Sequence, residues 1–164
     1  MPLKCGELFT DWPGWVGAIA GCAAAGVAAW QIAETRKETK RQAAFTHIRE
    51  VEERLQKIWP VSPAQARKEI LDYHCRNRDD LPKGAADYLA YLTALDLLVF
   101  ACETGSVDGK IATSWLKGSL RRDDPTLEFI AEFQQACGDQ SSFEYLGRHL
   151  LKERDKGLAK GQRK

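Results

Sequence analysis

The residues best suited to chemistry in this chain are its three histidines and five cysteines. The histidines are His47, His74 and His149. His74 and Cys75 are neighbours, so on a helix they point to different sides, whereas a zinc site needs four convergent ligands. Cys102 and Cys137 fall in apolar helical patterns, which is typical of small buried hydrophobic residues. With an odd cysteine count and no CxxC pair, we expect reduced thiols, no metal site and no cofactor.

Asp96 is the acidic residue that interrupts the apolar run "TALDLLVF". A carboxylate there must face water or find a partner. We expect a structural ion pair with Arg121 or Arg122, and the alternative is a functional carboxylate. No phosphate-binding glycine loop occurs, and a net charge of +1 without a basic aromatic stripe argues against nucleic-acid binding. The sequence therefore predicts no catalytic residue.

The element that would position everything else is the stretch from Trp12 to Ala33, which holds 22 residues and no charge. At about 1.5 Å per residue, a helix of this length spans a hydrocarbon core of roughly 30 Å. The expected membrane anchor uses Trp12, Trp15, Val16, Ile19, Val27, Trp30 and Ile32. A signal peptide, a lipoprotein signal with Cys22 in "IAGC", and a buried soluble helix are the alternatives.

Two further features of this stretch concern its partners and its orientation. Small residues at helical spacing, Gly17, Gly21, Ala25 and Ala29, would let two such helices approach closely and form a homo-oligomer. The alternative is that a helix rich in alanine and glycine places small residues at this spacing by chance. Four cations follow the apolar run: Arg36, Lys37, Lys40 and Arg41. By the positive-inside rule, the N-terminus is outside and residues 34–164 are cytoplasmic.

The rest of the chain shows helical periodicity and no alternating strand pattern. Residues 34–59 form a charged connecting helix whose apolar stripe is expected to dock onto the following domain: Phe45, Ile48, Val51, Leu55 and Ile58. Four to five short helices follow in residues 60–152, opened by Ser62-Pro63, Asp108-Gly109, Asp124-Pro125 and a Ser141/Glu144 capping box. In the helix after Asp108, Ile111, Trp115 and Leu120 are expected to face inward. The apolar core of the helix near residues 85–105 is interrupted by Asp96 and is expected to be too short for a second span.

The segments "DYLAYLTALDLLVFACETGSVDGKIATSWLKGSLRR" and "FIAEFQQACGDQSSFEYLGRHL" resemble a family of small bacterial and phage membrane proteins, catalogued as a domain of unknown function. The matching residues are Gly105, Val107, Asp108, Trp115, Phe143, Glu144 and Leu146, and the resemblance covers about residues 30–152. It implies one N-terminal span, a charged helix and a helical body. The family brings no assigned activity or site. Because some such proteins occur in prophages, a role in phage defence or superinfection exclusion is a further hypothesis.

Together these features predict an all-α protein of five parts. These are an extracytoplasmic N-terminus (1–11), a transmembrane helix (12–33), the connecting helix (34–59), a cytoplasmic helical domain (60–152) and a basic flexible tail (153–164). We expect a single-pass protein of a bacterial inner membrane that contacts lipid and binds other proteins there. The alternatives are a membrane-tethered enzyme or metal protein, and a soluble helical domain.

Overall fold

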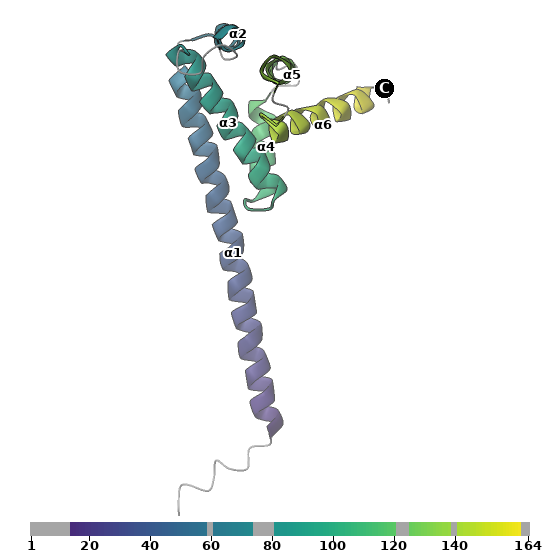
Figure 1. Ribbon diagram of the computed structural model, residues 1–164. Coiled ribbons are helices and arrows are strands. Elements are labelled where there is room, and N and C mark those ends of the chain that lie inside the picture. The colour runs from purple at the N-terminus through teal and green to yellow at the C-terminus, as the bar shows by residue number, and fades with distance from the viewer. Residues whose placement is uncertain (1–13, 59–60, 74–80, 121–124, 139–140, 162–164) are drawn as a thin grey trace, which may run out of the picture. The chain divides into compact units, whose positions relative to one another are not determined.

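The computed structural model describes residues 14–58, 61–73, 81–120, 125–138 and 141–161, and their side chains from residue 21 to residue 156 apart from those gaps and Tyr73. All regular structure in these ranges is helical, which confirms the predicted all-α class. The helices are α1 (Gly14–Ile58), α2 (Pro63–Tyr73), α3 (Lys83–Glu103), α4 (Gly109–Ser119), α5 (Thr126–Cys137) and α6 (Glu144–Gly161), as Figure 1 labels them. Contacts divide the chain into two units, residues 1–39 and residues 40–164.

The first unit is described from Gly14 onward and consists of the N-terminal part of α1. Every side chain from Gly21 to Thr39 is exposed, including Val27 and Trp30 at 55% and 66%. Alanine favours a helix without tertiary support because it loses no side-chain entropy. Thr35 also donates its hydroxyl to the Gln31 carbonyl at 2.8 Å. This part of α1 is thus a helix with exposed apolar side chains.

The second unit begins with residues 40–58 of α1, whose buried side chains are Ala44, Ile48, Val51 and Ile58. The predicted docking of this segment is confirmed for Ile48, Val51 and Ile58. Phe45 and Leu55 of the same predicted stripe remain 59% and 47% exposed. The buried face is centred on Ala44 and Ile48, and Phe45 lies about 100° further round the helix than Ala44.

The centre of this unit is α3, which packs against α2, α4 and α6. Its buried residues are Ala85, Tyr88, Leu92, Ala94, Leu95, Leu98, Val99 and Ala101. Gly105 follows the helix with φ +68°, and glycine suits this position because the left-handed conformation strains any residue with a Cβ. Within the described residues, α3 is the helix long and apolar enough to cross a membrane, contrary to the expectation that it is too short. A core helix passes the same test, and α3 buries eight of its residues, while Leu97 and Phe100 remain 49% and 39% exposed.

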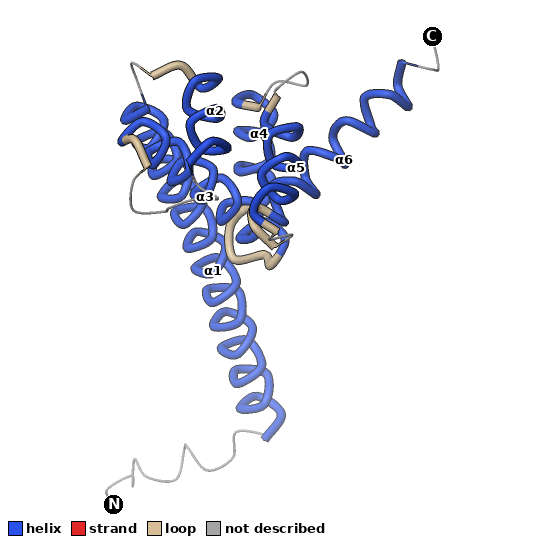
Figure 2. The backbone as a smooth tube through the Cα atoms, turned by 45° about the horizontal axis from the view of Figure 1, so that its top comes forward, coloured by secondary structure: helices blue, strands red, loops and turns tan. Residues whose placement is uncertain are grey.

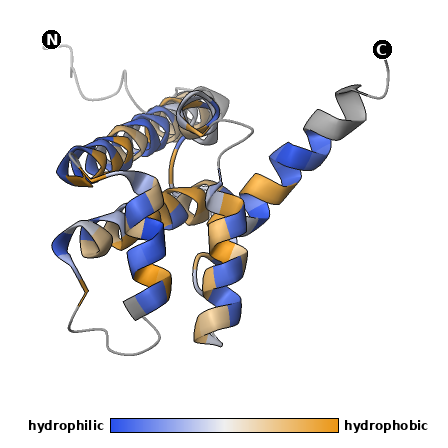
Figure 3. Ribbon diagram, turned by 90° about the horizontal axis from the view of Figure 1, so that it is seen from above, coloured by the Kyte–Doolittle hydropathy of each residue, from blue (hydrophilic) through white to orange (hydrophobic). Residues whose placement is uncertain are grey.

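Helices α2, α4 and α6 pack against α3, and α5 packs against α2 and α6 (Figure 2). In α2, Ala66 and Ile70 are buried. In α5, Phe129, Ile130 and Phe133 are buried, and Gly138 ends the helix with φ +65°. The C-terminal half of α6 extends away from the other helices, with polar and apolar residues both exposed along it (Figure 3). Residues 153–161 of the predicted tail are therefore helical.

The start of α6 differs from the predicted capping box. The helix begins at Glu144, after Phe143 takes the left-handed conformation with φ +57°. The Glu144 N–H donates to the Ser141 backbone carbonyl at 3.3 Å, and the Gly147 N–H donates to the Phe143 carbonyl at 2.9 Å. Residues 141–143 thus form a turn that leads into the helix.

Candidate functional site: a groove between two helices

An apolar concavity of the second unit lies between α1 and α4, and Asp108 fixes the start of α4 beside α1. As N-cap residue, Asp108 accepts hydrogen bonds from the backbone N–H groups of Lys110 and Ile111, at 3.0 and 3.4 Å. Its own N–H donates to the Lys40 carbonyl at 3.0 Å, and its carboxylate lies 3.7 Å from the Arg41 guanidinium. One acidic residue therefore both begins α4 and attaches it to α1.

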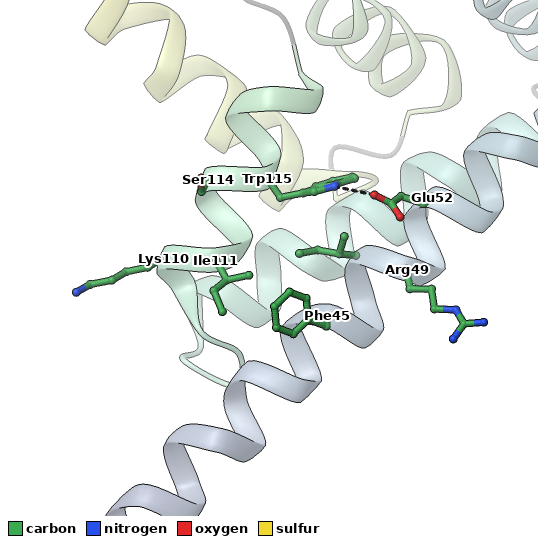
Figure 4. Close-up of a pocket in the computed structure, with 8 residues that line it drawn as sticks. Phe45, Arg49, Glu52, Lys110, Ile111, Ser114 and Trp115 are labelled. Atoms are coloured by element: carbon green, nitrogen blue, oxygen red, sulfur yellow. Dashed lines mark hydrogen bonds between the residues drawn. The ribbon is translucent and has the colours of Figure 1, made fainter.

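The groove between these helices has a volume of about 880 Å³. Apolar side chains from both helices form its floor and polar ones its margins. The lining residues are Phe45, Ile48, Arg49, Glu52, Lys110, Ile111, Ser114 and Trp115 (Figure 4). Ile111 and Trp115 are half-buried, and Phe45 is mostly exposed. The groove thus offers aromatic and aliphatic surface that the fold leaves partly uncovered.

Trp115 is held in place by one polar contact. Its indole Nε1–H donates to Glu52 Oε1 at 3.1 Å, linking α4 to α1 across the groove (Figure 4). This bond satisfies the polar group of the indole and leaves its ring available for apolar contact. Ile111, Trp115 and Leu120 were predicted to face inward, and all three are half-buried and pack against the core. The fully buried positions of α4 are Ala112 and Leu116, and the uncovered parts of Ile111 and Trp115 line the groove.

Two of the three charged side chains that line the groove, Arg49 and Lys110, are positive. They differ in whether they form a salt bridge within the described residues. Arg49 lies 2.9 Å from Glu53, one turn further along α1. Lys110 lies in the first turn of α4, which contains no acidic residue. Helix dipoles favour anions at this end, so a cation there runs against the local preference. Figure 4 shows Arg49 and Lys110 on opposite sides of the apolar residues.

The side chains that line this groove are mostly apolar or charged. Its lining contains no histidine or cysteine. It contains one hydroxyl side chain, Ser114, and Lys110 is the lining residue whose type could act as a base toward it. Across the part of the chain that the structure describes, no three His, Cys, Asp or Glu residues converge as a metal site would require. Aromatic and arginine side chains are the residue types that contribute most to protein interfaces.

A second, smaller concavity of about 490 Å³ lies between α5 and α6. Its apolar lining includes Leu127, Ala131 and Leu151, with Arg148 and Arg154 at its edge. Arg148 is already engaged, because it pairs with Glu103 at 3.2 Å and with Glu144. Arg154 is exposed and, like Lys110 in the first groove, forms no salt bridge within the described residues.

Asp96 contacts the start of α6. Its Oδ1 accepts a hydrogen bond from the Leu146 backbone N–H at 2.7 Å, and the Tyr145 backbone also contributes. Burial raises the pKa of Asp96 above its usual 3.8, while these backbone bonds lower it. Asp96 thus caps α6 from another helix, a role that local sequence cannot reveal. The predicted partners Arg121 and Arg122 lie outside the described residues.

The predicted membrane anchor falls only partly within the described side chains. Trp12 lies outside the described residues, and the structure gives Trp15, Val16, Gly17 and Ile19 a helical backbone only. Val27, Trp30 and Ile32 are exposed, as are the small residues Gly21, Ala25 and Ala29. A Cβ added at Gly21 would meet nothing within 4 Å.

The structure also describes the four flanking cations and the side chains of Cys102 and His149. Arg36, Lys37 and Lys40 are exposed, Lys37 lies 3.7 Å from Glu34, and Arg41 contacts Asp108. His74 and Cys75 lie outside the described residues. Burial raises the pKa of the Cys102 thiol and lowers that of His149, so each favours its neutral form.

The groove was not predicted, because Phe45, Ile111 and Trp115 were expected only to pack inward, and the parts of them that stay uncovered depend on how α4 lies beside α1. No protein family, curated protein or solved structure matches the chain.

Proposed function

We propose that this protein is anchored in a bacterial inner membrane by residues 12–33 and binds other proteins through its cytoplasmic helical domain. The observation that carries the proposal is the exposure of every side chain from Gly21 to Ala33, in a helical stretch without a single charge. In water this surface would be unfavourable, whereas in lipid it is the expected one. The helix also satisfies its own backbone hydrogen bonds, as a membrane requires.

The orientation rests on the cations that follow. Arg36, Lys37 and Lys40 are exposed and lie within seven residues of Ala33. Positive residues beside a span remain on the cytoplasmic side, which leaves the second unit in the cytoplasm. Confinement to a surface raises the effective concentration of the domain near membrane-bound partners.

The binding role rests on the groove between α1 and α4. It presents Phe45 and Trp115 without a catalytic side-chain arrangement. Contiguous apolar surface with polar side chains around it is typical of protein interaction sites. A binding function accounts for both the exposure of these aromatic residues and the fixed position of Trp115.

Membrane fractionation tests the anchor. The full-length protein is expected in the membrane pellet after a high-salt wash. Replacing Ala24 and Val27 by arginine adds a cost of about 5–7 kcal/mol at the helix centre and should release the protein. The matched control replaces both residues by leucine and should stay in the membrane. Recovery of the unmodified protein in the washed supernatant would exclude a span.

Protease treatment of spheroplasts tests the orientation. A tag at the N-terminus should be digested and a tag at the C-terminus protected. Replacing Arg36, Lys37 and Lys40 by glutamine should mix the two orientations, because it removes most of the charge bias. Arg41 is left unchanged because it contacts Asp108. Protection of the N-terminal tag in the unmodified protein would refute the proposed sidedness.

A further inference from the structure

We infer that the groove between α1 and α4 binds an amphipathic helix of a partner protein, and that an acidic residue on that helix pairs with Lys110. The inference rests on the proposed function, since it names the surface and the kind of partner. The apolar side chains of the groove require an apolar face on the partner helix. Lys110, which forms no salt bridge within the described residues, favours an acidic residue at the edge of that face.

The apolar requirement follows from the groove's walls. Two helices, α1 and α4, form its sides, and Phe45, Ile111 and Trp115 form its apolar surface. A third helix fits such a trough by placing apolar residues at i, i+3 or i+4 and i+7 into it. Because the Trp115 indole is already held by Glu52, little side-chain freedom is lost when a partner covers it.

The charge requirement follows from the start of α4. Lys110 is exposed, and no acidic side chain within the described residues forms a salt bridge with it. The nearest carboxylate along the chain, Asp108, is engaged by two backbone N–H groups and Arg41. The positive end of α4 adds to the charge of Lys110. Arg49 lies on the opposite side of the groove, and its exposed pair with Glu53 is a weak one.

These two requirements select the occupant. An uncharged apolar segment would cover Phe45 and Trp115 but leave Lys110 without a counter-charge. An acidic polar segment would pair with Lys110 but leave the aromatic surface exposed. A helix with an apolar face and a carboxylate at its edge satisfies both, because electrostatic complementarity fixes orientation while apolar burial supplies affinity.

Site-specific photocrosslinking in the full-length protein tests the inference in native membranes. A benzophenone amino acid is placed at Phe45 or Ser114 in the groove, and at Leu97 of α3 as an exposed control outside it. The expected result is one protein, identified by mass spectrometry, that crosslinks from both groove positions and not from Leu97. The crosslinked segment should be helical, with an apolar stripe and an acidic residue.

Charge reversal tests the role of Lys110. Lys110→Glu should lower the crosslinking yield at Phe45 about tenfold, and reversing the partner's acidic residue to lysine should restore it. The substitution suits the first turn of α4, so the fold should persist. Lys117→Glu, on the same helix outside the groove lining, should change the yield less than twofold.

The remaining outcomes overturn the inference. They are no adduct at the groove positions, adducts only with lipid or with a second copy of this chain, or an adduct insensitive to Lys110→Glu. Adducts with another protein from Leu97 but not from the groove would refute the inference and leave the proposed function intact. Absence of protein adducts from all three positions would count against both.

Discussion

Replacing Asp96 separates its role as a hydrogen-bond acceptor from its charge. Asp96→Ala removes the acceptor of the Leu146 N–H, which is bonded at 2.7 Å in a partly buried place. Asp96→Asn retains an oxygen at the same position and removes only the charge. We expect the alanine variant to be clearly destabilised and the asparagine variant to be close to the unmodified protein.

The magnitude follows from the contacts that are lost. A backbone N–H left unsatisfied at a partly buried site costs about 1–3 kcal/mol. Loss of a helix N-cap costs about 0.5–2 kcal/mol. Both costs describe the loss of the same hydrogen bond, so they are not added. We therefore expect Asp96→Ala to lower the free energy of unfolding by about 2 kcal/mol. Because burial disfavours the charged carboxylate, Asp96→Asn should cost less than about 0.5 kcal/mol at neutral pH.

Urea unfolding of the full-length protein in detergent, followed by far-ultraviolet circular dichroism, measures both values. With a urea dependence of about 2 kcal/mol per molar, the alanine variant should unfold at about 1 M less urea. Hydrogen exchange at Leu146 should accelerate in the same variant. Equal midpoints for the alanine variant and the unmodified protein, or equal losses in both variants, would refute the capping role.

The pH dependence has a definite sign. The pKa of Asp96 is raised on folding, so between its usual 3.8 and the higher folded value the folded protein holds more protons than the unfolded chain. Stability from this group therefore falls as pH rises through that window. The free energy of unfolding of Asp96→Asn relative to the unmodified protein should rise with pH there. A difference that is flat or falls with pH contradicts the assigned direction.

Three glycine substitutions test the packing of the helices, each by its urea midpoint in the same assay. Gly147→Ala should stabilise the protein by about 0.5–1 kcal/mol, because glycine weakens a helix interior and the added Cβ would meet Ile130 at an ordinary 3.6 Å. A loss of stability in this variant would mean that α5 and α6 lie closer together. Gly84→Ala should destabilise by about 1–3 kcal/mol, because its Cβ would lie 2.6 Å from Val61 Cγ2, and a neutral effect would disprove that contact. Gly138→Ala should cost about 1 kcal/mol, since φ is +65° there, and an unchanged midpoint would exclude the left-handed turn.

Much of the helical order could be read from local signals. Pro63 opens α2, Asp108 caps α4, and Gly105 and Gly138 follow α3 and α5 in the left-handed conformation. Such signals act within a few residues, because a cap satisfies backbone groups in its own first or last turn. The start of α6 was less predictable, since its acceptor for Leu146 comes from Asp96, fifty residues earlier.

The sequence alone determined that the chain is helical, where most helices begin and end, and that one stretch of 22 residues carries no charge. Tertiary structure decided how deeply each apolar side chain is buried: Ala112 and Leu116 fully, Ile111 and Trp115 in part, and Ile48 but not Phe45 of the predicted stripe. Periodicity identifies an apolar face only to within about one residue, or 100° of rotation. The position of the neighbouring helix selects within that range, and the side chains it leaves uncovered form the groove.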